Sequence, residues 1–282
     1  MKKIIVTGCN GQLGREINRF YKDNADIELI NTDVDELDIT DVEAIVAFCK
    51  KNEPYAIVNC AAYTAVDACE TNKDIAFKVN TLGPRNLAIA AKETNAKLVH
   101  ISTDYVFDGT NEGVYVESDA TNPQSVYGIT KAQAEDMVKQ FTDKYFIMRT
   151  AWLYGDGKNF VKTMLKLSET HDTVTVVGDQ FGTPTSTVEL VKAIDSLIFT
   201  HNYGTYHATC EGSCCWADFA EEIFKLADVN TKVVRTTTEE YAAPAPRPLH
   251  SVLDNYMLRM VGAYTFADWH DAIKVYMKEL GY

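Results

Sequence analysis

Residues 2–14 read KKIIVTGCNGQLG and join a predicted strand to a predicted helix through Gly8, Gly11 and Gly14. Glycine tolerates a positive φ and lets the backbone approach a ligand closely. The amino terminus of the following helix offers unpaired N–H groups and the positive end of its dipole, which suits a pyrophosphate. The spacing is G-x-x-G-x-x-G rather than the common G-x-G-x-x-G, and a tight turn without a ligand is the alternative. The strand before and the helix after favour a dinucleotide site.

Predicted strands and helices alternate through the first 150 residues. The expected strands are 2–8, 27–33, 56–62, 97–103 and 145–150, and the expected helices are 12–22, 38–54, 74–94 (with a break at Gly83-Pro84) and 123–141. Such alternation predicts an α/β fold with a doubly wound parallel sheet of the Rossmann type. The pattern loosens after residue 150. We therefore expect a dinucleotide-binding domain over 1–150 and a smaller C-terminal, mainly substrate-binding lobe over 151–282, some of whose segments return to the first sheet.

Composition and charge exclude several classes of protein. The 282 residues carry 27 Lys and Arg against 40 Asp and Glu, a formal net charge of −13, which disfavours nucleic acid as a partner. No apolar run is long enough to span a membrane, and the amino-terminal stretch lacks a signal-peptide pattern. The seven cysteines are odd in number and lie mostly in apolar runs, as reduced thiols do. These features predict a soluble, cytoplasmic protein.

Asp33 ends the second predicted strand, about twenty residues beyond the glycines. A carboxylate at this position accepts hydrogen bonds from a ribose diol and repels a 2′-phosphate. The sequence therefore favours NADH over NADPH as the cofactor and leaves NADPH open.

Tyr127 and Lys131 lie four residues apart at the start of a predicted helix, so they share one helix face. A phenol with a pKa of about 10 is a weak acid at neutral pH, and a nearby ammonium lowers that pKa. Thr103 lies at the end of the fourth predicted strand, where an open α/β sheet places its ligand crevice. A hydroxyl there can hydrogen-bond a substrate carbonyl. Together the three residues predict an active site with an acid–base group beside a substrate carbonyl.

These motifs resemble the extended short-chain dehydrogenase/reductase family. The resemblance rests on the glycine turn, NCAA (59–62), KVN (78–80), STD (102–104) and Tyr-x-x-x-Lys. A closer resemblance, over nearly the whole chain, is to the branch of dTDP-4-dehydrorhamnose reductases. It is carried by GCNGQLG (8–14), NCAAYTAVDACE (59–70), STDYVFDG (102–109), YGITKAQAE (127–135), RTAWLYG (149–155), DQFGTPT (179–185) and APRPLHSVLD (245–254).

The resemblance implies NAD(P)H-dependent reduction of the C4 ketone of dTDP-4-dehydro-β-L-rhamnose to dTDP-β-L-rhamnose. Tyr127 would donate the proton, Lys131 would tune it and hold the nicotinamide ribose, and Thr103 would complete the catalytic triad. The implied cofactor-binding residues are Gly8, Asn10, Gly11, Gln12, Leu13, Gly14, Asp33, Asp38, Ile39, Ala61, Ala62, Tyr63, Thr64, Asn80, Ser102, Tyr127 and Lys131. The implied contacts with the nucleotide-sugar substrate are Thr103, Asp104, Tyr127, Trp152 and Arg247.

Two other functions stay open: a nucleotide-sugar epimerase or dehydratase of the same fold, and a non-catalytic subunit resembling the regulatory subunit of a methionine adenosyltransferase. No metal site is predicted. His207, Cys210, Cys214 and Cys215 lack a usual zinc spacing, and Glu16 alone leaves a magnesium contact undecided. His100 lies in an apolar strand and is interpreted as a core residue. A homodimer and a monomer are equally compatible with the sequence.

Overall fold

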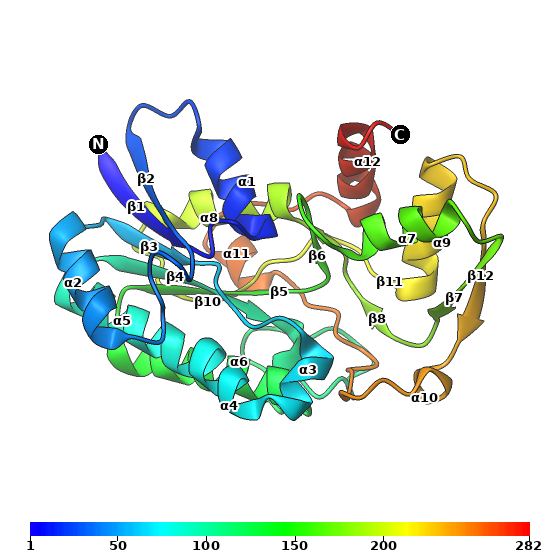
Figure 1. The fold of residues 1–282 in the computed structure, drawn as a ribbon, viewed down its shortest axis with the longest axis horizontal. Helices are drawn as coiled ribbons and strands as arrows, with labels where there is room; N and C mark the ends of the chain where they lie inside the picture. Colours follow the sequence, from blue (N-terminus) through cyan, green and yellow to red (C-terminus); the bar gives the residue numbers. More distant parts are fainter.

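The computed structural model describes residues 1–282 as a parallel sheet covered by helices on both faces, with a smaller lobe beside it (Figure 1). The sheet has six strands in the order β10-β5-β4-β3-β1-β2, and every neighbouring pair is parallel. Their bounds are β1 (Lys2–Thr7), β2 (Ile27–Thr32), β3 (Ala56–Asn59), β4 (Lys97–Thr103), β5 (Tyr145–Thr150) and β10 (Gly204–His207). The predicted doubly wound α/β fold is confirmed.

The strand order reverses direction at β1. β2 lies on one side of β1 and β3 on the other, so the loops after β1 and β3 leave the sheet toward opposite faces and open a crevice between them. Register pairs Thr7 with Asn59, and Asn59 with His100. The three side chains therefore form one row across the sheet near the carboxyl ends of the strands, directly beneath the crevice.

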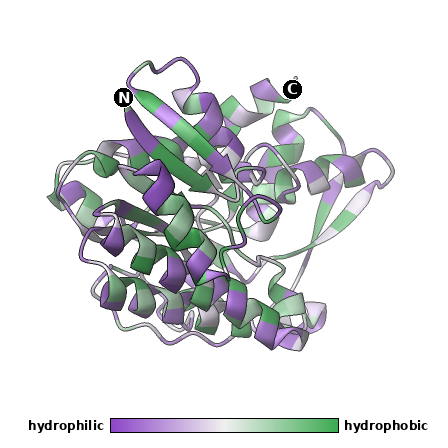
Figure 2. Ribbon diagram, turned by 60° about the vertical axis from the view of Figure 1, so that its left-hand side comes forward, coloured by the Kyte–Doolittle hydropathy of each residue, from purple (hydrophilic) through white to green (hydrophobic).

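The strands are nearly continuous apolar runs because both faces of the sheet are buried. Ile4 and Val6 belong to the core under α1 (Gln12–Tyr21) and α8 (Thr187–Ile198), while Ile5 belongs to the core on the opposite face. That second face is covered by α2 (Val42–Asn52), α5 (Gly83–Glu93) and α6 (Val126–Phe141). Figure 2 shows the hydrophobic colour concentrated on the central strands, with hydrophilic stretches on the surrounding helices.

The helix expected over 74–94 is interrupted earlier than predicted. It consists of α4 (Lys73–Phe77), a π-helical turn η1 (Lys78–Leu82) and α5, which begins at Gly83. Pro84 follows directly on the π-helical turn, in which the Gly83 N–H bonds the Lys78 carbonyl five residues earlier. The local disturbance is therefore the π-helical turn before the Gly-Pro pair.

The second half of the chain forms most of the smaller lobe and also contributes α8 and β10 to the sheet region (Figure 1). Its two-stranded pairings are β6 (Leu153–Tyr154) with β9 (Thr185–Ser186), β7 (Thr173–Val177) with β12 (Lys232–Thr236), and β8 (Phe181–Gly182) with β11 (Cys214–Cys215). Its longer helices are α7 (Phe160–Ser168), α9 (Trp216–Leu226) and α12 (Trp269–Glu279). Short helical segments are α3 (Val66–Thr71), η2 (Asp104–Val106), α10 (Thr238–Tyr241) and α11 (Tyr256–Met260). None of the helices has the length and apolar character that crossing a bilayer requires.

Candidate functional site

The glycine turn leaves room for a ligand beside the backbone of β1 and β3. Gly8 has φ +63°, and a Cβ there would lie 2.8 Å from the Ala61 nitrogen. A Cβ on Gly14 would lie 2.5 Å from the Gly8 oxygen, so glycine is needed for the helix to pack against the turn. No side chain caps α1 at Gly11. The free N–H groups of this helix terminus and the open cradle fit a pyrophosphate.

A hollow of about 260 Å³ continues from the turn toward the end of β2. Asp33 lies on its wall, and its Oδ2 accepts a hydrogen bond from the Asn10 N–H at 3.1 Å. The other predicted cofactor residues on this wall are Gly8, Gly11, Asp38, Ile39, Ala61 and Ala62. Its size and its carboxylate fit the adenosine end of a dinucleotide.

A larger crevice, of about 550 Å³, shares Gly11, Ala61 and Ala62 with that hollow. The crevice thus brings together residues from the glycine turn and the start of α1, from β3, from β4 and from α6, which are far apart in the sequence. Further predicted site residues on its wall are Gln12, Leu13, Thr64, Ser102, Thr103, Asp104, Tyr127, Lys131 and Trp152.

The first turn of α6 places Tyr127 in the crevice. Ser125 caps the helix by accepting the Gly128 N–H at 3.1 Å. A Cβ on Gly128 would lie 2.2 Å from the Tyr105 oxygen, so this glycine lets α6 lie against the loop that follows β4. Burial raises the pKa of Tyr127, and the charge of Asp104 adds to that rise. Tyr127 is therefore held as a phenol, the form that donates a proton.

Lys131 and Asp104 are both buried without an ion-pair partner. The Lys131 Nζ donates to the Ile101 carbonyl at 2.5 Å, and burial lowers the pKa of Lys131 to about 8. Asp104 Oδ1 accepts the Thr103 hydroxyl at 2.9 Å, whereas no donor lies within hydrogen-bonding distance of its buried Oδ2. The Ser251 hydroxyl donates to the Phe181 carbonyl at 3.5 Å and is near enough to Asp104 to oppose the rise in its pKa. Burial raises the pKa of Asp104 to about 6. An unsatisfied acceptor at the wall of a crevice is suited to a ligand hydroxyl.

Three predicted residues use their polar groups or their backbone within the protein rather than toward the crevice. Asn80 uses its amide to hold the loop at Tyr63, accepting the Tyr63 N–H at 2.8 Å and donating to the Tyr63 carbonyl at 3.1 Å. Ser102 lines the crevice but donates its hydroxyl to Glu135 at 2.6 Å. Gly14 is buried beneath the turn. The contacts of Asn80 are those of a residue that positions the cofactor loop.

Trp152 meets a residue that sequence reasoning missed. Its ring stacks on Trp216, the first residue of α9, with centroids 3.6 Å apart. Trp152 has φ +49°, an uncommon backbone conformation for a bulky side chain, and a Cβ on Gly182 would lie 2.7 Å from its ring. Both tryptophans line the crevice. No local sequence pattern could have indicated Trp216, because the contact joins two distant segments.

Arg247 lies outside the crevice that contains Tyr127. Its Nη2 binds both carboxylate oxygens of Asp67, at 3.0 and 2.9 Å, and its Nη1 binds the Tyr105 hydroxyl at 3.1 Å. It lines an adjacent hollow of about 390 Å³ with a mostly hydrophobic wall. Tyr105 and Trp216 line both spaces, so they form the partition between them.

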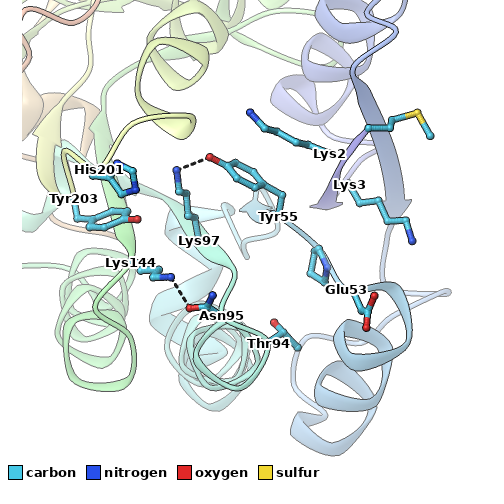
Figure 3. Close-up of a pocket in the computed structure, with 12 residues that line it drawn as sticks. Lys2, Lys3, Glu53, Tyr55, Thr94, Asn95, Lys97, Lys144, His201 and Tyr203 are labelled. Atoms are coloured by element: carbon cyan, nitrogen blue, oxygen red, sulfur yellow. Dashed lines mark hydrogen bonds between the residues drawn. The ribbon is translucent and has the colours of Figure 1, made fainter.

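The opposite edge of the sheet carries another hollow, of about 600 Å³, near the start of β1 (Figure 3). Lys97 lies there with its amine already bound by the Tyr55 hydroxyl and by the carbonyls of Ile198 and Thr200, at 2.7, 2.9 and 2.8 Å. The hollow is basic, but it faces the amino ends of the strands, away from the glycine turn and Tyr127. In open α/β sheets, ligands bind at the carboxyl ends.

The residues considered for metal binding have other partners. The His207 ring faces Arg149, with 3.5 Å between Nε2 and Nη1, and Cys215 caps α9. Glu16 pairs with Arg19 at 2.7 Å. No group of three His, Cys, Asp or Glu side chains is arranged to hold a metal ion.

Comparison with known proteins identifies relatives along the full chain. The family model described as "RmlD substrate binding domain" matches residues 1–282. A solved structure of a dTDP-4-dehydrorhamnose reductase from Clostridium acetobutylicum is 51% identical, with a TM-score of 0.98 over 99% of this chain and 100% of that one. The dTDP-4-dehydrorhamnose reductase from Bacillus anthracis, solved in complex with NADP, is 40% identical, with a TM-score of 0.96 over 99% and 100% of the two chains.

A curated relative extends the comparison to polysaccharide synthesis. The spore coat polysaccharide biosynthesis protein SpsK of Bacillus subtilis is 39% identical over 99% of this chain and 98% of its own. Epimerase folds are also similar: a Thermus thermophilus UDP-glucose 4-epimerase has a TM-score of 0.83 over 98% of each chain, but at 18% identity it supports the fold alone. The full-length match therefore confirms the resemblance seen in the motifs: the chain belongs to the RmlD substrate binding domain family, whose members here include dTDP-4-dehydrorhamnose reductases.

Proposed function

We propose that the protein reduces the C4 ketone of dTDP-4-dehydro-β-L-rhamnose to dTDP-β-L-rhamnose, with NADH or NADPH as the reductant. The observation that carries the proposal is the shared wall of the glycine-turn hollow and the crevice, which puts Thr103, Asp104, Tyr127 and Lys131 beside a cofactor-sized space. The names of the relatives support the same activity.

In this reaction, bound NAD(P)H supplies the hydride, and the protein supplies position and a proton. Tyr127, held as a phenol, protonates the alkoxide that develops at C4. The Thr103 hydroxyl hydrogen-bonds the same oxygen, and Lys131 stabilises negative charge on Tyr127 while it holds the nicotinamide ribose. The free Oδ2 of Asp104 accepts a hydroxyl of the sugar.

The partition residues Tyr105 and Trp216 define where the two parts of the substrate lie. We assign the sugar to the crevice against Trp152, and the nucleotide to the adjacent hydrophobic hollow, where Arg247 offers its charge to the diphosphate. Arg247 is already paired with Asp67. It can therefore bind the diphosphate only if its guanidinium contacts the Asp67 carboxylate and the diphosphate together. We also propose that the boundary between the dinucleotide-binding domain and the substrate-binding lobe lies near residue 150. Residues on both sides of that position line the crevice.

We propose NADH as the preferred cofactor. Asp33, Asp35 and Glu36 surround the end of β2, and no arginine stands among them to receive a 2′-phosphate. The prediction is tested by the ratio of kcat/KM for NADH to that for NADPH.

The deciding experiment measures NADH oxidation with dTDP-4-dehydro-β-L-rhamnose made in place by the preceding enzymes, with Tyr127→Phe alongside. Stoichiometric oxidation that stops in the variant supports the reductase. An epimerase or dehydratase would instead convert nucleotide sugars without net oxidation of NADH. A non-catalytic subunit would turn over no nucleotide sugar and would copurify with a synthetase partner.

A further inference from the structure

A row of buried polar side chains crosses the sheet beneath the crevice and ends at Lys131. The Thr7 hydroxyl donates to Asn59 Oδ1 at 2.7 Å, the Asn59 Nδ2 lies 3.1 Å from His100 Nδ1, and His100 Nε2 lies 3.3 Å from Lys131 Nζ. All four residues are at most 2% exposed. The function proposed above uses only the last of them.

The orientation of the Asn59 amide determines where the His100 ring carries its proton. Asn59 Oδ1 also accepts the Ala61 backbone N–H at 3.2 Å. A backbone N–H can only donate, so the oxygen of the amide must face Ala61 and its nitrogen must face His100. An amide NH₂ can also only donate, so His100 Nδ1 must accept. A neutral His100 ring therefore carries its proton on Nε2, the atom that faces Lys131.

In this tautomer the His100 Nε2–H faces the N–H groups of Lys131 when the lysine is charged, so two donors oppose each other. An ammonium has three N–H groups and no lone pair, whereas a neutral amine can accept the Nε2–H. The only carboxylate acting on Lys131 is Glu135, one turn along α6, and it is occupied by Arg149 at 2.9 and 2.7 Å. Burial and the Lys131 charge also hold the pKa of His100 well below its ordinary value, so the ring stays neutral.

We propose that His100 is a positioning residue for Lys131: fixed by Asn59 as the Nε2–H tautomer, it disfavours the ammonium and thereby sets the upper pH limit of turnover. The proposal rests on the proposed function. Burial raises the pKa of Tyr127 strongly, so the first proton that the pair loses as pH rises comes from Lys131. Once it is lost, the positive charge that assists Tyr127 and strengthens the hydrogen bonds to the ribose is lost with it.

The first measurement is the ring ¹⁵N spectrum of histidine-labelled protein, with His100 assigned by its disappearance in His100→Gln. We expect the shifts of a ring protonated at Nε2. A ring protonated at Nδ1 would overturn the proposal. This readout needs neither substrate nor turnover, so it is independent of whether the proposed reaction is correct.

The second measurement is the pKa of Lys131, followed by its side-chain carbon shift. His100→Leu removes the N–H that faces the ammonium without adding a charge, and Asn59→Asp forces the ring proton onto Nδ1, so each should raise the pKa of Lys131 by about one unit. The basic limb of kcat/KM should move to higher pH by the same amount. His207→Gln removes another fully buried histidine, one that faces Arg149, and should leave the Lys131 titration unchanged.

Two variants keep the test decisive if one fails to fold. An unchanged Lys131 pKa in whichever of them folds would show that His100 serves packing alone. A shifted pKa with an unmoved basic limb would show that a group other than Lys131 sets the upper pH limit, and would overturn that part of the proposal. A correct tautomer and a shifted Lys131 pKa in a protein that reduces no nucleotide sugar would overturn the proposed function and leave the His100–Lys131 coupling in place.

Discussion

Helix α6 carries two buried charged residues one turn apart, Lys131 and Glu135, and their surroundings differ in kind. Glu135 receives Arg149 at two atoms and the Ser102 hydroxyl, so every oxygen is satisfied. Burial alone would raise the pKa of Glu135, but hydrogen bonds from Arg149 hold it below its ordinary value. Lys131 has no carboxylate partner, and the nearby Asp104 keeps one buried oxygen free.

The difference separates scaffold from site. A fully partnered buried charge holds β4, β5 and α6 together and has no capacity left for a ligand. The groups around Lys131 keep unused hydrogen-bonding capacity toward the crevice, and their pKa values shift in the directions that burial alone produces. Such shifts are typical of functional sites, where desolvation is not fully compensated.

The largest expected effect lies on the crevice side. Tyr127→Phe removes the proton donor without changing the shape of the ring, so kcat should fall ~10²–10⁴-fold. The Kd for NADH, measured by fluorescence titration, should stay the same. Tyr115→Phe alters a buried tyrosine that pairs with Asp108 outside the crevice and serves as the control. Near-normal turnover in Tyr127→Phe would assign the proton to another group.

The scaffold side should respond in stability. Glu135→Gln leaves Arg149 buried without its counter-charge, which should lower the free energy of unfolding by about 3–5 kcal/mol. Asp271→Asn breaks the exposed pair with Lys274 and should change it by less than about 0.5 kcal/mol. Urea unfolding at pH 7 measures both. If both variants lose the same small amount of unfolding free energy, the Glu135–Arg149 pair does not stabilise the fold more than an exposed ion pair does.

Removing the charge of Asp104 should raise the free energy of unfolding at pH 7, whereas removing that of Glu135 should lower it. The pKa of Asp104 in the folded state is about 6, above its ordinary value, so the unfolded chain ionises first as pH rises from about 4 to 6. The contribution of Asp104 to stability is therefore lost as pH rises through this window. Asp104→Asn should be more stable than the parent at pH 7, by as much as about 3 kcal/mol, and lose that advantage below about pH 4.

The same variant should turn over more slowly, because the amide replaces a charged acceptor for the substrate. Asp108→Asn is the matched control. Four hydrogen bonds, from Thr110 (twice), Tyr115 and Asn122, lower the pKa of Asp108, so its replacement should destabilise the protein at pH 7. If both substitutions destabilise the protein at pH 7, the burial of the ionised Asp104 carboxylate does not cost folding free energy, and the prediction is wrong.

The smallest effect concerns cofactor choice. Asp33→Asn keeps an acceptor for the Asn10 N–H and removes the charge that opposes a 2′-phosphate. The ratio of kcat/KM for NADPH to that for NADH should rise about tenfold, equivalent to about 1.4 kcal/mol. Asp35→Asn, at an exposed neighbouring position, should move the ratio less. No change in either variant would remove Asp33 from cofactor discrimination.

Local patterns predicted much of the fold and part of the site. The glycine turn, the spacing of Tyr127 and Lys131, and Thr103 at the end of β4 each follow from rules that act over a few residues. The π-helical turn at Lys78–Leu82 escaped prediction because helical periodicity is the same on either side of it. The pairing of β10 with β5 escaped because edge strands in the second half carry no pattern that identifies their partner.

By itself, the sequence determined the strand–helix alternation, the phosphate turn and the four-residue spacing of the acid and its lysine, because these depend on backbone preferences and helix geometry. Only the tertiary structure decided that Trp152 stacks on Trp216, that Arg247 binds Asp67, that Asp104 keeps an oxygen free and that His100 faces Lys131. Most of these are contacts between residues that are distant in the chain. The Asp104 oxygen is free because the surrounding packing places no donor beside it. The sequence specifies which donors and acceptors these side chains carry, but their partners are determined only when the sheet and the helices pack together.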